Sequence, residues 1–451
     1  MLFDVTQNFI DQEEIQMMLK QSMLGLLVTG AMLAISGNAA ASAFALIEQG
    51  SGAGNAYAGG AAGAEDATTI WFNPAGMSRL KGNQVTVAAS SINLSSKFSD
   101  SGSTGAALQT AGGNGGDAGS TVLVPNTYMV TEMEPALHFG LGIFVPFGLQ
   151  TEYTPNWIGR FQAIKSKIQT VNLNPSVSYQ MNDNVSLGLG ASYQHISGDL
   201  TSAVNYSAAA FGTAAYPFVG ANSEGVSSIT GSDSAWGYNL GVLISVMPNA
   251  RLGLSYRSKI KYTLNGTINF SGVPAALASS PALANGGVTM PITMPDTFSI
   301  SGFHQVSDKW DFMADATWTG WSAVQQLVIS RTDGTVVQTT PEHWKNTWRV
   351  AVGATYHYSE QWLSRVGAAY DQTPVPDAYR TARIPDSNRT WLTLGGQYQS
   401  SPSGKFDFGY AHLFMNNASI ASNQTAAGAG DLVGTYSNSV DILSVQYAYS
   451  F

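Results

Sequence analysis

The chain ends in LSVQYAYSF, residues 443–451, and this stretch alternates between two kinds of side chain. Because successive side chains of a β-strand point to opposite faces, the alternation predicts a strand with two unlike faces. One face holds large apolar residues, and the other holds only Ser, Gln and Ala. A soluble β-sandwich would also alternate, but its polar face would carry more Lys and Glu. A small, uncharged polar face suits the crowded interior of a transmembrane barrel.

Fourteen stretches carry this alternation, the last strand included: residues 84–97, 124–132, 136–149, 166–181, 184–200, 233–247, 251–267, 292–305, 308–322, 345–358, 361–371, 388–399, 404–416 and 437–451. Their connections are alternately short, as at 181–184 and 359–360, and long, as at 201–232 and 268–291. This pattern is typical of an even-stranded barrel with short periplasmic turns and longer outer loops. The sequence therefore predicts an all-β fold, a transmembrane antiparallel barrel of about 14 strands with both ends periplasmic.

The composition also favours a membrane barrel over a soluble domain. Only 11% of the 451 residues are charged, whereas about a quarter is usual in soluble proteins. Beyond residue 40 no apolar run approaches the roughly 20 residues of a membrane helix. The chain has no cysteine, which excludes disulfides and thiolate metal sites. A formal net charge of −9 argues against a nucleic-acid partner.

Tryptophans gather near the ends of the predicted strands. Eight of the ten lie there: Trp157, Trp236, Trp318, Trp321, Trp344, Trp348, Trp362 and Trp391. Aromatic girdles mark the two interfaces of a membrane barrel, so we expect most of these residues to face the membrane interfaces and the rest to be core or loop residues.

The start of the chain predicts an export signal. Lys20, an apolar run at 23–35 and two A-x-A motifs, which allow cleavage after Ala41 or after Ala43, supply its three parts. Residues 1–16 carry four acids, which do not suit a signal, so translation is expected to start at Met17 or Met18. The predicted organisation is a signal peptide at 1–41, an N-terminal hatch at 42–82 and the barrel at 83–451.

The hatch contains FALIEQGSGAGNAYAGGAAGAEDATTIWFNPAGM, residues 44–77, which shows neither strand alternation nor a sustained helical stripe. Its glycines permit close packing, and Asn73-Pro74-Ala75-Gly76 predicts a rigid turn. Irregular backbone at membrane depth must be shielded from lipid, which favours a plug inside the barrel. The alternative is a flexible linker before the first strand.

Several segments together resemble the FadL-type family of outer-membrane transporters for long-chain fatty acids and hydrocarbons. The likeness is carried by the mature N-terminal region with Asn73-Pro74-Ala75, and by GRFQA at 159–163, NPSVSY at 174–179 and ARIPDSNRTW at 382–391. The resemblance implies a monomeric barrel in the bacterial outer membrane, closed by the hatch. It also implies energy-independent uptake, with the ligand leaving sideways through the wall. Phe451 resembles the C-terminal signal of outer-membrane proteins, which implies contact with the barrel-assembly machinery.

The lateral route has a local signal in the third predicted strand, at Pro146, Phe147 and Gly148. Proline cannot donate to the hydrogen-bond ladder and glycine weakens it, so a bulge, kink or gap is expected here. In the resemblance this position opens the wall beside the hatch. Alternatively, these residues simply begin the second outer loop.

The ligand is expected in an apolar lumen, and its candidate contacts are Phe44, Leu46, Val145, Phe147, Arg160, Phe161 and Arg383. Phe44 matches an aromatic residue that borders the ligand pocket in the family, although it could serve only as an anchor for the hatch. Arg160, Lys165, Arg380 and Arg383 are the bases available to a carboxylate, unless acids such as Asp386 or Glu152 pair with them. Asn73, Pro74 and Ala75 form the hatch motif and are expected to be architectural.

Two long links carry apolar residues suited to capturing a ligand: Tyr206, Phe211, Tyr216, Pro217 and Phe218 in the third, and Phe270, Val273, Pro274, Leu277, Pro281 and Leu283 in the fourth. Apolar groups in exposed loops favour a binding surface, although the loops could instead pack on one another.

Other function classes are less well supported. The six histidines show no metal spacing and no nucleophile motif is present, so we predict no enzyme activity, no cofactor and no metal site. A general diffusion porin needs an open lumen lined by charge, whereas this chain is poor in charge and has a plug-like N-terminal segment. The expected partners are a long-chain fatty acid or a hydrocarbon, with outer-membrane lipid and lipopolysaccharide around the barrel. The choice among fatty acid, alkane and aromatic cargo stays open.

Overall fold

The computed structural model describes residues 43–451. The predicted signal peptide and translation start lie outside this range. Between residues 43 and 451, no helix is both long and apolar enough to cross a membrane.

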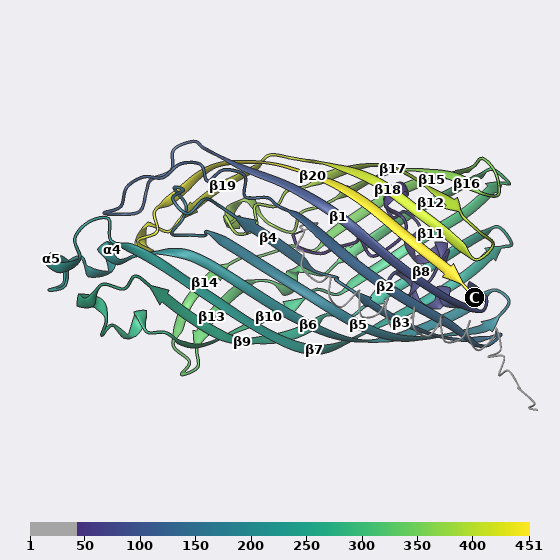
Figure 1. Ribbon diagram of the computed structural model, residues 1–451, viewed down its shortest axis with the longest axis horizontal. Coiled ribbons are helices and arrows are strands. Elements are labelled where there is room, and N and C mark those ends of the chain that lie inside the picture. The colour runs from purple at the N-terminus through teal and green to yellow at the C-terminus, as the bar shows by residue number, and fades with distance from the viewer. Residues whose placement is uncertain (1–42) are drawn as a thin grey trace, which may run out of the picture. The chain divides into compact units, whose positions relative to one another are not determined.

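The described chain is dominated by one antiparallel sheet that closes on itself (Figure 1). Its strand segments are β1 (Asn83–Asp100), β2 (Thr121–Glu134), β3 (Leu137–Phe144), β4 (Gly148–Glu152), β5 (Lys165–Asn182), β6 (Val185–Asn205), β7 (Glu224–Met247), β8 (Ala250–Arg257), β9 (Ile260–Ser271), β10 (Gly286–Met294), β11 (Thr297–Ser307), β12 (Trp310–Thr319), β13 (Gln326–Arg331), β14 (Val336–Pro341), β15 (Thr347–His357), β16 (Trp362–Asp371), β17 (Arg389–Gln399), β18 (Gly404–Met415), β19 (Ala418–Asn423) and β20 (Asp431–Ser450).

These segments make fourteen wall strands. Six wall strands are each interrupted once, as β3/β4, β8/β9, β10/β11, β12/β13, β14/β15 and β18/β19, so the 20 segments give 20 − 6 = 14 strands. The first and last strands close the barrel in a continuous register from Gln84↔Ser450 to Asp100↔Gly434. The predicted fourteen-stranded barrel is confirmed.

Several strands continue further towards the long loops than the sequence indicated. β7 begins at Glu224 and β20 at Asp431, and the predicted link at 323–344 contains β13 and β14. The expected boundaries followed the end of apolar alternation. The hydrogen-bond ladder continues past that point through Ser, Thr and Gly, because its backbone bonds do not require apolar side chains.

The two faces of the wall follow the alternation of the last strand. Leu443 and Val445 are 58% and 55% exposed on the outer face, whereas Ser444 and Gln446 are buried inside. The girdle prediction holds less well. Trp236, Trp348 and Trp362 are exposed on the wall, as expected of girdle residues. The girdle prediction was wrong for four others, which are fully buried: Trp157, Trp321, Trp344 and Trp391.

The N-terminal segment forms four short helices: η1 (Ala53–Asn55), α2 (Gly60–Gly63), α3 (Thr69–Phe72) and η2 (Pro74–Arg79). They contact inward-facing residues of the wall strands. The Asn73 side chain accepts from the Ala75 amide and donates to the carbonyls of Ala61 and Val242, at 2.7 and 3.0 Å. It therefore ties the turn before η2 both to α2 and to strand β7.

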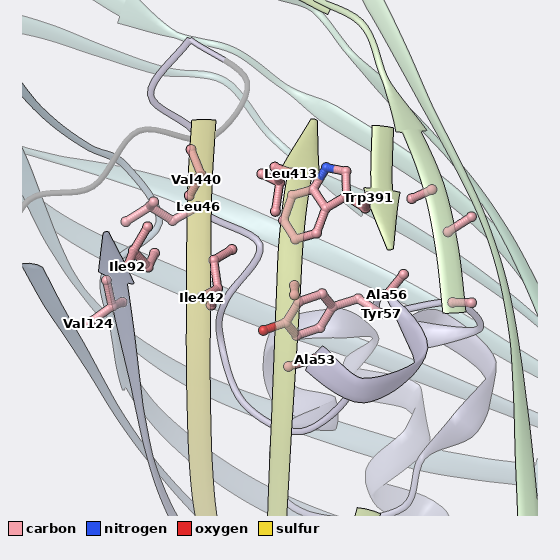
Figure 2. Close-up of a cluster of buried hydrophobic side chains, with 14 of the residues drawn as sticks. Leu46, Ala53, Ala56, Tyr57, Ile92, Val124, Trp391, Leu413, Val440 and Ile442 are labelled. Atoms are coloured by element: carbon pink, nitrogen blue, oxygen red, sulfur yellow. The ribbon is translucent and has the colours of Figure 1, made fainter. Parts of the chain in front are cut away.

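An apolar cluster joins this segment to the wall (Figure 2). Leu46, Ala53, Ala56 and Tyr57 pack against Ile92, Val124, Trp391, Leu413, Val440 and Ile442, which belong to β1, β2, β17, β18 and β20. Here large inward side chains on the wall meet small ones, such as Ala53 and Ala56, on the N-terminal segment.

The remaining helices lie in the links: α4 (Tyr206–Ala210), α5 (Tyr216–Val219), η3 (Ala275–Leu277), η4 (Pro281–Leu283), η5 (Trp321–Ala323), η6 (Asp377–Tyr379) and η7 (Thr425–Ala427). α4 and α5 lie at one end of the barrel, and the C-terminus lies at the other, which carries the tight turns (Figure 1). We call these the long-loop end and the short-turn end.

Candidate ligand-binding site

An apolar cavity lies inside the barrel, towards the long-loop end. Apolar side chains supply most of its lining: Leu149, Ile168, Ile196, Leu200, Ile229, Leu264, Val288, Met290, Ile292, Leu327 and Ile329 of the wall strands, and Ile384 of the link before β17. We refer to this space as the apolar cavity.

Phe44 lies in the hydrophobic cluster that also contains Leu149, Ile168 and Ile292 of the cavity lining. Its ring is 1% exposed and contacts three other aromatic rings. The centroid distances are 4.9 Å to Trp321, 5.5 Å to Trp344 and 6.0 Å to Phe147. The apolar cavity therefore ends at an aromatic cluster centred on the first residues of the hatch.

Two ionisable residues line this mainly apolar space: Glu342, in the interruption between β14 and β15, and Arg383, in the link before β17. Burial raises the pKa of Glu342 to about 8, although the Trp344 indole, which donates to its carboxylate at 2.8 Å, and the charge of Arg383 oppose the shift. Burial lowers the pKa of Arg383 to about 10. At neutral pH Glu342 is mostly protonated and Arg383 is charged, so the cavity carries one net positive charge.

The guanidinium of Arg383 is held in place by neutral acceptors. Its Nη1 donates to the Lys165 carbonyl at 3.1 Å and to the Ser166 hydroxyl at 3.0 Å. These bonds fix the direction of the group but leave its charge uncompensated. The remaining donors suit a carboxylate, which accepts charge-assisted and often bidentate bonds from arginine.

A larger, more polar space lies at the long-loop end, and we call it the vestibule. It shares Gln338 and Thr340 of β14 with the apolar cavity. A ligand that enters between the long loops would therefore meet the apolar cavity directly below the vestibule.

The third and fourth links pack on each other beside this entrance. Tyr206, Ala210 and Leu277 form their buried contact. Phe211 and Phe218 remain 64% and 82% exposed at the outer end. The loops therefore pack together, as the second interpretation expected, and they leave aromatic rings exposed, whose role in ligand capture stays a prediction.

The wall is interrupted at residues 145–147, between β3 and β4, and we call this the wall break. β2 pairs with β3 only up to Thr127↔Ile143, and β4 pairs with β5. Residues 121–126 of β2 consequently pair with β1 and with no other described strand. This is the position of Pro146, Phe147 and Gly148.

The start of the hatch lies against the wall break from the inside. The Leu46 amide donates to the Pro146 carbonyl at 2.9 Å, and the Gly148 amide donates to the Phe44 carbonyl at 2.8 Å. The Gln49 side chain donates to the Val145 carbonyl at 2.7 Å. Of the seven candidate ligand residues, this arrangement brings together Phe44, Leu46, Val145 and Phe147.

The other candidates lie elsewhere. Arg383 lines the apolar cavity and Phe161 lines the vestibule. Arg160 donates to the Glu224 carboxylate at 2.9 and 3.0 Å and is not among the residues that line the apolar cavity. Lys165 pairs with Asp199 at 2.7 Å, and Arg380 pairs with Asp377 at the same distance.

Sequence reasoning missed Trp321, Trp344 and Glu342. The two tryptophans were assigned to a girdle because they lie near strand ends, and Glu342 is one of two acids inside a long predicted link. The available signal was local: an acid and a tryptophan two residues apart, in a chain with few charges, indicated a buried polar contact.

Comparison with known proteins agrees with this architecture. Residues 32–451 match the family described as outer membrane protein transport protein (OMPP1/FadL/TodX). The chain is 31% identical to a putative outer membrane protein of Neisseria meningitidis over 87% of this chain and 91% of that protein. It is 29% identical to the long-chain fatty acid transport protein of Escherichia coli K12, over 82% and 87% of the two chains.

The crystal structure of a Pseudomonas aeruginosa FadL homologue has the same fold. It superposes with a TM-score of 0.83 at 28% identity, covering 90% of this chain and 99% of that one. The barrel, its fourteen strands and the match over nearly the whole described chain lead to one assignment. The chain is an integral outer-membrane β-barrel that belongs to the OMPP1/FadL/TodX family of transport proteins, not of enzymes.

Proposed function

We propose that the protein takes up long-chain fatty acids across the outer membrane. The carboxylate binds Arg383 and the acyl chain lies in the apolar cavity. The observation that carries this proposal is the charge of that cavity: an uncompensated guanidinium in a space lined mostly by aliphatic side chains. A neutral hydrocarbon gains nothing from such a group, whereas a carboxylate offsets its charge.

The route follows from the order of the spaces. Exposed Phe211 and Phe218 first contact the acyl chain, which then passes through the vestibule into the apolar cavity. The aromatic cluster around Phe44 separates that cavity from the wall break. Displacement of residues 44–49 from the wall break then releases the ligand sideways, between β2 and β4.

The experiment is a displacement titration on the detergent-purified protein. A fluorescent fatty acid is bound and then displaced by oleate, by methyl oleate or by a neutral hydrocarbon. We expect Arg383→Gln to weaken oleate binding by about tenfold or more, the range of one charge-assisted contact, and to leave methyl oleate unchanged. Arg160→Gln is the matched control, because it also removes a buried guanidinium, but one that is paired with Glu224.

Two outcomes would change the assignment. Displacement by hydrocarbons alone, unaffected by Arg383→Gln, would make the protein a hydrocarbon channel. Steady ion conductance without any ligand binding would make it a diffusion porin.

A further inference from the structure

A second space lies among the hatch helices and the wall, and we call it the hatch-side cavity. Ala45, Leu46 and Ile47 line it, whereas the neighbouring Phe44 belongs to the aromatic cluster at the end of the apolar cavity. The first hatch residues therefore separate the two cavities. The lining of the hatch-side cavity combines aromatic rings, Trp71 and Phe72 among them, with charged and hydroxyl side chains of the wall.

Most charges around this space are already paired. Arg349 lies 3.6 Å from Asp315, and Arg389 lies 3.5 Å from Asp371. Each of these arginines thus has a carboxylate of the barrel wall beside it.

Arg257, the last residue of β8, is the exception. No carboxylate within residues 43–451 lies within ion-pair distance of its guanidinium. Its Nη2 donates to the Trp71 carbonyl at 3.0 Å, and its Nη1 donates to the Ser192 hydroxyl at 3.4 Å. These neutral acceptors orient the group without cancelling its charge, which is costly inside a barrel away from bulk water.

Two aromatic rings pack beside the guanidinium of Arg257. The guanidinium carbon lies 4.1 Å from the centroid of the Trp71 ring and 5.5 Å from that of Phe144. The Trp71 and Phe144 rings themselves meet edge to face, with centroids 4.9 Å apart. A guanidinium that packs its face over aromatic rings can still bind an anion through the N–H groups at its edge.

The position of Phe144 gives this site its place on the route. Phe144 is the last residue of β3, so the wall break begins at the next residue. Arg257 therefore touches the ring beside the break and also lines the hatch-side cavity.

We propose that Arg257 is a second carboxylate site, which holds the head of a fatty acid in the hatch-side cavity after it leaves Arg383 and before it exits at the wall break. This proposal rests on the proposed function and adds one intermediate binding site to the proposed route. The ligand class is a monocarboxylate with a long apolar chain, bound by the guanidinium and by the rings of Trp71 and Phe144.

The test compares uptake of oleate and of methyl oleate by Gram-negative cells that lack their own carrier of this family and express the full chain. We expect Arg257→Gln to lower oleate uptake about fivefold or more, as expected for one lost charge-assisted contact, and to leave methyl oleate uptake unchanged. Because the apolar cavity is intact, equilibrium binding of the fluorescent fatty acid at Arg383 should stay within twofold. Arg257→Lys keeps the charge and should restore part of the oleate uptake.

Three results are decisive against the proposal. Equal oleate uptake by Arg257→Gln and the wild type would overturn it. Equal loss of oleate and methyl oleate uptake in Arg257→Gln would do so too, because that pattern assigns Arg257 a structural role in seating Trp71. If the uptake of oleate and the uptake of methyl oleate fall together even in Arg257→Lys, the same structural assignment holds. Failure of the proposed function is distinct, since then the wild type itself would neither bind nor take up oleate.

Discussion

Ala45 and Phe147 pair in an isolated antiparallel β-bridge, which joins the segment that enters the barrel to the segment that interrupts its wall. The bridge brings the backbones of the two residues as close as neighbours in a sheet. Any ligand that leaves through the wall break must separate them.

This pairing predicts that a disulfide across the bridge blocks release. Bridged β-residues have the Cα separation that a disulfide needs, and the chain contains no other cysteine. We expect the oxidised Ala45→Cys/Phe147→Cys protein to retain fatty-acid binding within a few-fold but to lose at least about nine-tenths of its uptake. Reduction should restore uptake, and each single cysteine variant is the control. Undiminished uptake by the fully oxidised protein would rule out release at this position.

Phe44 supplies the next prediction, since its ring contacts Phe147, Trp321 and Trp344 at the end of the apolar cavity. Removing it deletes a contact surface for the acyl chain and opens a void. We expect Phe44→Ala to weaken binding of a fluorescent fatty acid by about tenfold, because the acyl chain loses part of the apolar contact that a buried aromatic ring provides. Phe98→Ala is the control, because Phe98 is equally buried but packs on Trp157 and Tyr436. Equal effects of the two changes would mean that only general stability is measured.

Glu342 predicts a pH dependence of binding. With its pKa raised to about 8 by burial, the carboxyl is neutral at pH 7 and gains a charge as the pH passes 8. That charge competes with a ligand carboxylate for Arg383, so the affinity for oleate should fall about fivefold to tenfold between pH 7 and pH 9. The Glu342→Gln variant should lose this dependence, and methyl oleate should show none in either protein. Parallel pH profiles for wild type and variant would contradict the prediction.

Glu48, fully buried in the hatch, predicts a pH dependence of stability. Burial raises its pKa from 4.5 to about 7, although Arg349 and Arg389 oppose the shift. Between these values the unfolded chain releases the proton and the folded protein keeps it, so the free energy of unfolding falls as the pH rises, by up to about 3 kcal/mol. Glu48→Gln should match the wild type at pH 4 and unfold at a higher temperature at pH 8. A thermal midpoint difference that does not change with pH would disprove this.

Gly241 on β7 is required by the hatch. A Cβ atom there would overlap the Asn73 Oδ1 atom and lie 3.0 Å from Pro74 Cδ. Gly241→Ala is therefore expected to destabilise the barrel by about 1–3 kcal/mol through overpacking, measured as a lower thermal midpoint. Gly302→Ala on β11 is the matched control, because a Cβ at that strand glycine has open space within 4 Å. Similar shifts for both variants would indicate a general cost of replacing strand glycine.

The strands were predictable because the membrane imposes a period of two on every wall strand, as in 443–451. The break at 145–147 was predictable for the local reason that proline cannot donate and glycine adds no packing. The contacts between residues on different sides of the lumen were not predictable from the sequence. Arg160 pairs with Glu224, and Trp321 meets Phe44, far apart in the chain, and no spacing in the sequence specifies such contacts.

Trp321 and Trp344 lie near strand ends in the sequence but are buried in the lumen. Proximity to a strand end is shared by girdle residues and by residues of a link that folds back into the lumen. The sequence distance to the membrane interface is the same in both cases. Only the path of the link decides which way the indole points.

The strip of β2 at residues 121–126, which pairs on one side only, gives an otherwise edgeless cylinder a short seam. At that seam the backbone bonds that would join neighbouring strands were never formed. The proposed sideways release would therefore not require any strand-to-strand ladder to open at this point. The same seam should be the first part of the wall whose amide hydrogens exchange with solvent.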